Sequence, residues 1–177
     1  SVGLISIPVH MAGSRELGVL KRYHASGMPT WVVVGASVVT MFVVALFSAI
    51  LLIVVAKLVH DIVLPESTVS VAAAFILSGF AFASLGVLLG AVLPNARAAQ
   101  ALGVLLWFVM LILGGAGPPP EVLTGAMDFV GSITPLRHAI RAVQDGWLAL
   151  DAGLSWLIFC AVGLACALLG LRLFRWE

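Results

Sequence analysis

Charged residues are scarce in this sequence. Only 10% of its 177 residues are Asp, Glu, Lys or Arg, whereas soluble proteins use about 25%. The chain is 62% hydrophobic and its mean hydropathy is +1.19. A chain so poor in charge cannot cover a water-facing surface, which excludes a soluble globular domain. The net charge of +1, without any Lys/Arg-rich block, also excludes nucleic acid as a partner.

Catalytic and cofactor motifs are missing as well. The two lysines, Lys21 and Lys57, do not follow a glycine, so the phosphate-binding GxxxxGK[ST] loop is absent. The chain therefore cannot hydrolyse ATP by that route. No HExxH, GxSxG or CxxC occurs, and the four histidines are scattered over different segments. We expect no catalytic residue, no metal site and no cofactor.

Cysteine is scarce too, since only Cys160 and Cys166 are present and both lie in one apolar run. Six residues at roughly 100° each place them on different sides of a helix. We expect no disulfide between them, and the simplest interpretation is two small buried hydrophobic residues.

Four long runs contain no charged residue, and they predict the architecture. Each is long enough to cross about 30 Å of hydrocarbon at about 1.5 Å per residue. The runs cover residues 31–56, 69–93, 98–117 and 152–171. Residues 1–13 are apolar but shorter than the roughly 17 residues that a span needs, so we interpret them as the end of a truncated span. The predicted fold is all-α, a polytopic transmembrane helix bundle of four complete spans plus this end.

Basic residues alternate between the connections and predict their sidedness. Residues 14–30, the turn at Arg97 and the tail 172–177 together contain six Lys and Arg, and the other two connections contain three. Lys and Arg concentrate on the cytoplasmic side of membrane proteins. We therefore expect residues 14–30, the Arg97 turn and the C-terminus to be cytoplasmic in an inner (plasma) membrane.

Residues 118–151 are predicted to be more than a connection. A glycine-rich stretch and prolines 118–120 end the third span. Thr134 and Pro135 then suit a helix start. An apolar face and a charged face follow at helical spacing, which predicts an amphipathic or re-entrant outer helix, either a cap on the bundle or part of an outer gate. The candidate gate residues are Pro135, Leu136, Arg137, Ile140 and Arg141.

Small residues recur at helical spacing in two of the spans. Gly86 and Gly90 lie in one, and Gly163, Ala167 and Gly170 in the last. This spacing permits close approach between helix backbones. We expect it to serve helix packing in general, and it indicates a dimer seam only weakly.

The segment before the first long run carries a resemblance. Residues 15–22 read R-E-L-G-V-L-K-R, with a proline at position 29 just before the run. They resemble the R-E-x-G-x-L-K-R segment of the type-two ABC exporter permeases, the membrane subunits of ABC transporters. The likeness continues through N-A-R-A-A-Q at 95–100 and T-P-L-R at 134–137. In that family the segment is the cytoplasmic coupling helix that docks on the ATPase, and the matching residues are Arg15, Glu16, Gly18, Leu20, Lys21 and Arg22.

The resemblance implies a permease subunit of an ATP-driven exporter. It implies three partners: an ABC ATPase subunit, a second permease copy in a homodimer or heterodimer, and the lipid bilayer. This chain would be the C-terminal portion of a six-span permease, and its substrate (drug, lipid or polysaccharide) stays open. On the residues alone, residues 15–22 could instead be a positive-inside anchor. The alternative function, a secondary carrier or channel not driven by ATP, is disfavoured because the four spans contain no charged residue or histidine.

Overall fold

The computed structural model describes the chain except for residues 28, 61–62, 64, 118–123, 149–152 and 174–177. Within the described residues all regular elements are helical and no strand occurs, which confirms the predicted all-α class. The elements in chain order are η1 (Val2–Ser6), α1 (Ile7–Glu16), α2 (Val19–Ala25), α3 (Thr30–His60), α4 (Thr68–Val92), α5 (Ala96–Leu113), α6 (Gly125–Ile133), α7 (Pro135–Leu148) and α8 (Gly153–Leu173). The prolines expected to end the third span, the end of the outer segment and most of the C-terminal tail lie outside the described residues.

Long apolar helices correspond to the four predicted spans. Three of them, α3, α4 and α5, are long and apolar enough to cross a membrane, and the described core of α8, Ser155–Gly170, is apolar as well. The predicted helix bundle is thereby confirmed. Helix α3 continues four residues past the predicted end of its run, to His60. Its last turn carries Lys57, a cation at the end where the helix dipole is negative.

Side-chain caps define the ends of α4 and α5. The Ser67 hydroxyl accepts the Ser70 N–H at 3.3 Å and begins α4, and the Asn95 side chain accepts the Ala98 N–H at 2.8 Å and begins α5. Such caps satisfy amides that the first helical turn leaves without a partner. Since α4 ends at Val92, only three residues separate it from α5, and the two helices reverse direction across a tight α4–α5 turn (residues 93–95).

Glycines allow the helices to pack backbone against backbone. A Cβ at Gly86 would overlap the Gly3 carbonyl, one at Gly90 would lie 3.0 Å from Met11 Cβ, and one at Gly103 would overlap the Leu4 carbonyl. The segment η1–α1 therefore occupies a groove that glycines of α4 and α5 create. The small residues noted in the sequence thus serve packing within one chain, as they do in α8, where Gly163 and Gly170 face α4.

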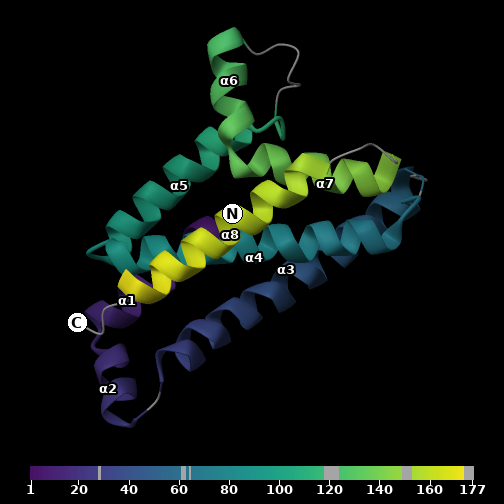
Figure 1. Cartoon of the computed structure of the whole chain (residues 1–177). Coiled ribbons are helices and arrows are strands. Elements are labelled where there is room, and N and C mark those ends of the chain that lie inside the picture. Colours follow the sequence, from purple (N-terminus) through teal and green to yellow (C-terminus); the bar gives the residue numbers. More distant parts are fainter. Residues whose placement is uncertain (28, 61–62, 64, 118–123, 149–152, 174–177) are drawn as a thin grey trace.

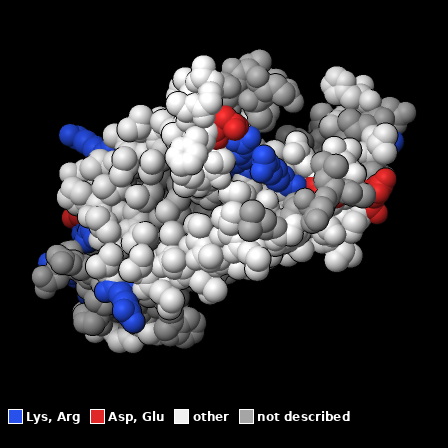
Figure 2. Space-filling model, turned by 45° about the horizontal axis from the view of Figure 1, so that its top comes forward, with Lys and Arg blue, Asp and Glu red and all other residues white. Residues whose placement is uncertain are grey.

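Helix α4 is the central element, because α1, α7 and α8 all pack against it. In Figure 1 the α1–α2 turn, the α4–α5 turn and the end of α8 lie at one end of the molecule, which we call the α2 end. The α3–α4 connection and α7 lie at the opposite end, the α7 end. Figure 2 shows charged side chains at the left of the view and in a band that runs from its middle to the right, with a broad uncharged surface over the rest of this face. This uncharged surface suits helices that face hydrocarbon.

Candidate functional site

The α1–α2 turn is built by Gly18. Its φ of +67° lies in the left-handed region, which costs other L-residues roughly 1–2 kcal/mol. The Gly18 N–H donates to the Arg15 carbonyl at 3.0 Å, and the Leu17 N–H donates to the Gly13 carbonyl at 3.0 Å. These bonds end α1 in the manner of a glycine C-cap. The glycine in the R-E-x-G pattern therefore has a backbone role, the change of direction between α1 and α2.

The Arg15 side chain points from α1 to the end of α4. Its guanidinium donates to the Ala91 carbonyl at 3.2 Å and also to the Leu93 carbonyl. Carbonyls in the last turn of a helix have no partner within that helix. A cation there satisfies them and interacts favourably with the negative end of the helix dipole. Arg15 therefore caps α4 from outside.

Glu16 does the same for α5 with the opposite charge. Its carboxylate accepts the N–H of Ala96, the first residue of α5, at 3.1 Å. An anion is favourable at this end, where the helix dipole is positive and the amides lack partners. Arg15 and Glu16 are thus adjacent in the sequence and hold the two sides of one α4–α5 turn, each matched to the dipole of the helix that it meets.

The side chains of the other candidate coupling residues are either buried or exposed. Leu20 is buried at 3% exposure, whereas the Lys21 and Arg22 side chains are exposed. Leu17 is 76% exposed. Sequence reasoning did not select it because it occupies the variable position of the motif. The turn thus presents one apolar and two basic side chains outward: Leu17, Lys21 and Arg22.

The predicted outer helix exists as α7 and begins at Pro135, as expected. The four apolar residues of its predicted face are only half-buried, namely Leu136, Ile140, Val143 and Trp147. The buried positions other than Arg137 and His138 are small: Ala139, Ala142 and Gly146. Two of them, Ala139 and Ala142, pack with Ala74, Ala81 and Phe159 of α4 and α8. Helix α7 therefore lies close against the spans through its small residues, with the larger ones around the rim and Arg141 exposed.

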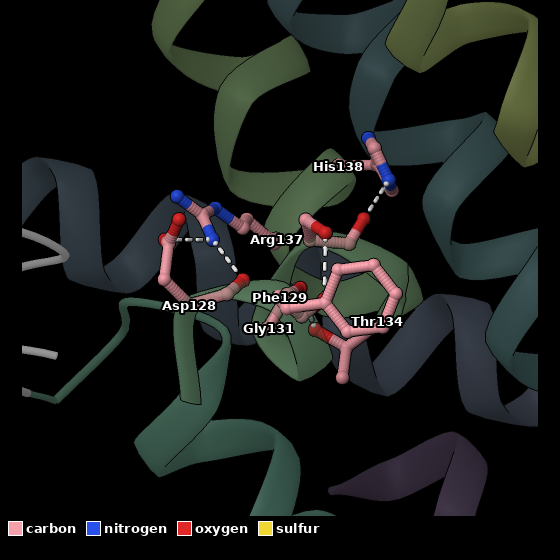
Figure 3. Close-up of polar contacts among 7 residues, drawn as sticks. Asp128, Phe129, Gly131, Thr134, Arg137 and His138 are labelled. Atoms are coloured by element: carbon pink, nitrogen blue, oxygen red, sulfur yellow. Dashed lines mark hydrogen bonds and ion pairs between the residues drawn. The ribbon is translucent and has the colours of Figure 1, made fainter. Parts of the chain in front are cut away.

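Arg137 is buried, although the pattern placed it on the charged face. It is 7% exposed, and its Nη1 donates to Asp128 Oδ1 at 2.6 Å and to the Asp128 carbonyl at 3.0 Å, as Figure 3 shows. Its Nε is buried and has no hydrogen-bond partner in the described part of the chain. Asp128 belongs to α6, a helix that the sequence did not predict. The ion pair fastens α6 to the start of α7.

His138 is a further buried polar residue that sequence reasoning missed. Its Nε2 lies 2.9 Å from the Ser132 carbonyl, and its Nδ1 lies 3.4 Å from the Ser155 hydroxyl of α8. A carbonyl oxygen can only accept, so Nε2 is the donor in the first of these contacts. Arg137 therefore connects α7 to α6, and His138 connects α7 to both α6 and α8.

The far end of α7 is fastened to the α3–α4 connection. Trp147 Nε1 donates to the Val63 carbonyl at 3.0 Å, and the Ser67 N–H donates to the Gly146 carbonyl at 3.1 Å. A cavity of about 380 Å³ lies between α3 and α4, and Trp147 forms part of its almost wholly apolar lining. In the described residues no group of three or more His, Cys, Asp or Glu could hold a metal ion.

Comparison with protein families identifies one match. The family model described as ABC-2 type transporter matches residues 3–148, well over half of the chain. The matched region contains the α1–α2 turn, the α4–α5 turn and the α6–α7 unit. Neither the curated proteins nor the solved structures contain a match. The resemblance drawn from the sequence is thereby confirmed at the level of the family.

Proposed function

The chain belongs to the ABC-2 type transporter family, and from that premise we propose that it forms the translocation pathway of an ATP-driven exporter. Family membership makes it a multi-pass membrane protein and the permease component of an ABC transporter, a transport subunit whose family works with an ABC ATPase subunit.

We propose that the ATPase binds the docking surface formed by Leu17, Lys21 and Arg22. The observation that carries this proposal is the outward exposure of those three side chains beside the turn that Gly18 allows. An exposed leucine offers an apolar anchor, and two neighbouring cations offer charge-assisted hydrogen bonds to carboxylates of a partner. Most other exposed apolar side chains lie on the long helices that face lipid, where no soluble ATPase can reach them.

The α2 end is then the cytoplasmic side of the inner (plasma) membrane, where the ATPase and ATP are found. The excess of basic residues in the connections at this end supports the orientation. The C-terminal tail follows α8, which ends at the α2 end, so we place it in the cytoplasm as well. The α7 end faces outward, and the α6–α7 unit would act there as an outer gate.

We propose that a second permease copy completes the pathway, in a homodimer or heterodimer, as the resemblance implies. On this view the unit of function is two permease copies with two ATPase subunits.

The test is a binding and transport assay in membranes that contain the permease and its ATPase. Replacing both exposed cations, Lys21→Glu with Arg22→Glu, should weaken ATPase binding by at least about tenfold, because two charge-assisted contacts are each worth about 1.5–3 kcal/mol. Lys57→Glu makes the same change at an exposed position of the α7 end and should leave binding unchanged. Parent-like ATPase binding by the double variant would exclude this docking surface. Transport driven by an ion gradient without any bound ATPase would favour a secondary carrier or channel instead.

A further inference from the structure

We propose that Arg15 and Glu16 are positioning residues that lock the α1–α2 turn to the α4–α5 turn, so that movement of α2 is transmitted directly to α4 and α5. This inference rests on the proposed function, because it takes α2 as the place where the ATPase acts. The sequence pattern alone placed these two side chains among the residues that contact the ATPase. Here they bind backbone groups of their own chain instead.

The contacts at this joint tie together groups that are distant in the sequence. Arg15 reaches carbonyls 76 and 78 residues away, and Glu16 reaches an amide 80 residues away. All of these partners are backbone groups at helix ends. A side chain bound to a helix end moves that helix as a whole, whereas a bond to a flexible side chain could be absorbed by a rotamer change. The joint is therefore suited to transmit displacement.

Close packing beneath these bonds makes the joint stiff. Ala12 is fully buried, a Cβ on Gly13 would lie 3.7 Å from Ala96 Cβ, and Met11 lies against Gly90. Packed helices cannot slide far without loss of such contacts. Helix α1 is consequently held against α4 and α5 over its whole final turn, and not by two polar contacts alone.

Helix α4 offers a route from this joint to the other end of the molecule. At about 1.5 Å per residue its 25 residues extend over about 37 Å. At its far end Ser67, the cap of α4, donates its N–H to Gly146 of α7. Displacement of the α4–α5 turn thus reaches the α6–α7 unit through one continuous helix.

Two residue sets follow from this geometry. Leu17, Lys21 and Arg22 make the outward surface and would bind the ATPase, whereas Arg15 and Glu16 bind backbone groups of their own chain and would transmit its motion. Binding and transmission should therefore be separable by mutation. Glu16→Ala is expected to keep the affinity for the ATPase within about twofold. It should lower ATP hydrolysis by the permease–ATPase complex by roughly tenfold, within the range of about 5- to 150-fold that coupling between two sites usually shows.

A disulfide across the same joint provides the decisive control. The separation of 3.7 Å between Cβ positions at Gly13 and Ala96 matches the mean of about 3.8 Å in disulfides. Gly13→Cys with Ala96→Cys, in a background with both native cysteines replaced by alanine, should therefore crosslink on oxidation. If Glu16 acts only by holding the joint, oxidation should restore hydrolysis in the Glu16→Ala variant, and reduction should abolish it again. Glu16→Gln, which keeps an acceptor oxygen for Ala96, should retain most of the activity.

The experiment measures ATPase affinity and ATP hydrolysis in the reconstituted complex, with and without the crosslink. Preserved binding, lost hydrolysis and rescue by the crosslink support the inference. Weakened ATPase binding by Glu16→Ala, unchanged hydrolysis, or loss of hydrolysis that the formed crosslink does not restore would each overturn it while leaving the docking surface in place. If the parent permease binds no ATPase, the proposed function is wrong and the inference falls with it.

Discussion

Gly146 provides the sharpest test of how α7 is held against the spans. A Cβ at this position would lie 2.7 Å from the Val71 backbone nitrogen and 2.8 Å from Val71 Cγ2. Ordinary contact begins near 3.4 Å, so Gly146→Ala requires α7 and α4 to separate by roughly 0.7 Å. A gap of about 0.5–1 Å already forfeits a quarter to a half of the dispersion attraction across an interface.

The cost of Gly146→Ala has three parts. Overpacking costs about 1–3 kcal/mol. The separation also lengthens the Ser67 N–H to Gly146 carbonyl bond, now 3.1 Å, which adds about 1 kcal/mol. The higher helix propensity of alanine offsets about 1 kcal/mol. The free energy of unfolding should therefore fall by about 1–3 kcal/mol, which for a domain of this size lowers the Tm by about 2–12 °C.

Two other helical glycines serve as matched controls. A methyl group added at Gly35 would meet no atom within 4 Å in the described part of the chain beyond its own helical backbone, so Gly35→Ala should raise the Tm through helix propensity. One added at Gly163 would meet the Phe80 side chain at 3.2 Å, and since that ring can move, Gly163→Ala should have an intermediate effect. Thermal unfolding of the detergent-solubilised protein measures the series. Equal Tm values for Gly146→Ala and Gly35→Ala would refute the contact between α7 and α4.

Three further predictions concern the α6–α7 unit and the topology. Asp128→Ala removes the partner of the buried Arg137 and should destabilise the protein by about 2–4 kcal/mol. The further change Arg137→Met should recover part of that loss. A double-mutant cycle of Tm values measures both effects. Ile140→Asp puts a carboxylate at a half-buried position and should lower protein abundance in membranes, which immunoblotting measures; parent-like abundance would indicate a loosely attached helix. Single cysteines at the exposed positions Arg97 and Glu66 should react with an impermeant maleimide from opposite sides, cytoplasmic and external respectively, and labelling from one side would contradict the topology.

The spans were predictable from the sequence because residues that face hydrocarbon must be uncharged over the whole length of a span. Uncharged runs of sufficient length located α3, α4, α5 and α8, and the start of α7 followed from Thr134 and Pro135. The role of Gly18 could also be anticipated, since a glycine after a helical turn commonly takes the left-handed conformation. In each of these cases a local residue type determines the outcome.

The contacts of Arg15 and Glu16 could not be predicted because their partners are not distinctive residue types. Arg15 and Glu16 bind backbone groups of Ala91, Leu93 and Ala96, and any residue offers such groups. Nothing in the sequence of residues 15–22 distinguishes this use from attraction to another protein. The partners became visible only when the α4–α5 turn was placed beside α1.

The burial of Arg137 was missed for a related reason. Its partner Asp128 lies in α6, a helix of nine residues whose N-cap makes no side-chain hydrogen bond, so its start carried no clear signal. Helical periodicity assigns a residue to a face, but it does not say which neighbouring element covers that face. A short helix folded back on α7 turned the charged face into a partly interior one.

The contrast between α3 and α4 has a consequence for how far each helix can vary. Among the side chains described in α3, only Val34 is buried, whereas α4 buries eight residues, most of them Ala or Gly. Almost any apolar residue satisfies hydrocarbon, but the space beside a buried glycine admits no larger side chain. A library in which α3 is rewritten with other apolar residues should therefore yield many inserted, folded proteins. A library of the same kind in α4 should yield few folded proteins, because neighbouring helices already occupy the space that a larger side chain would need.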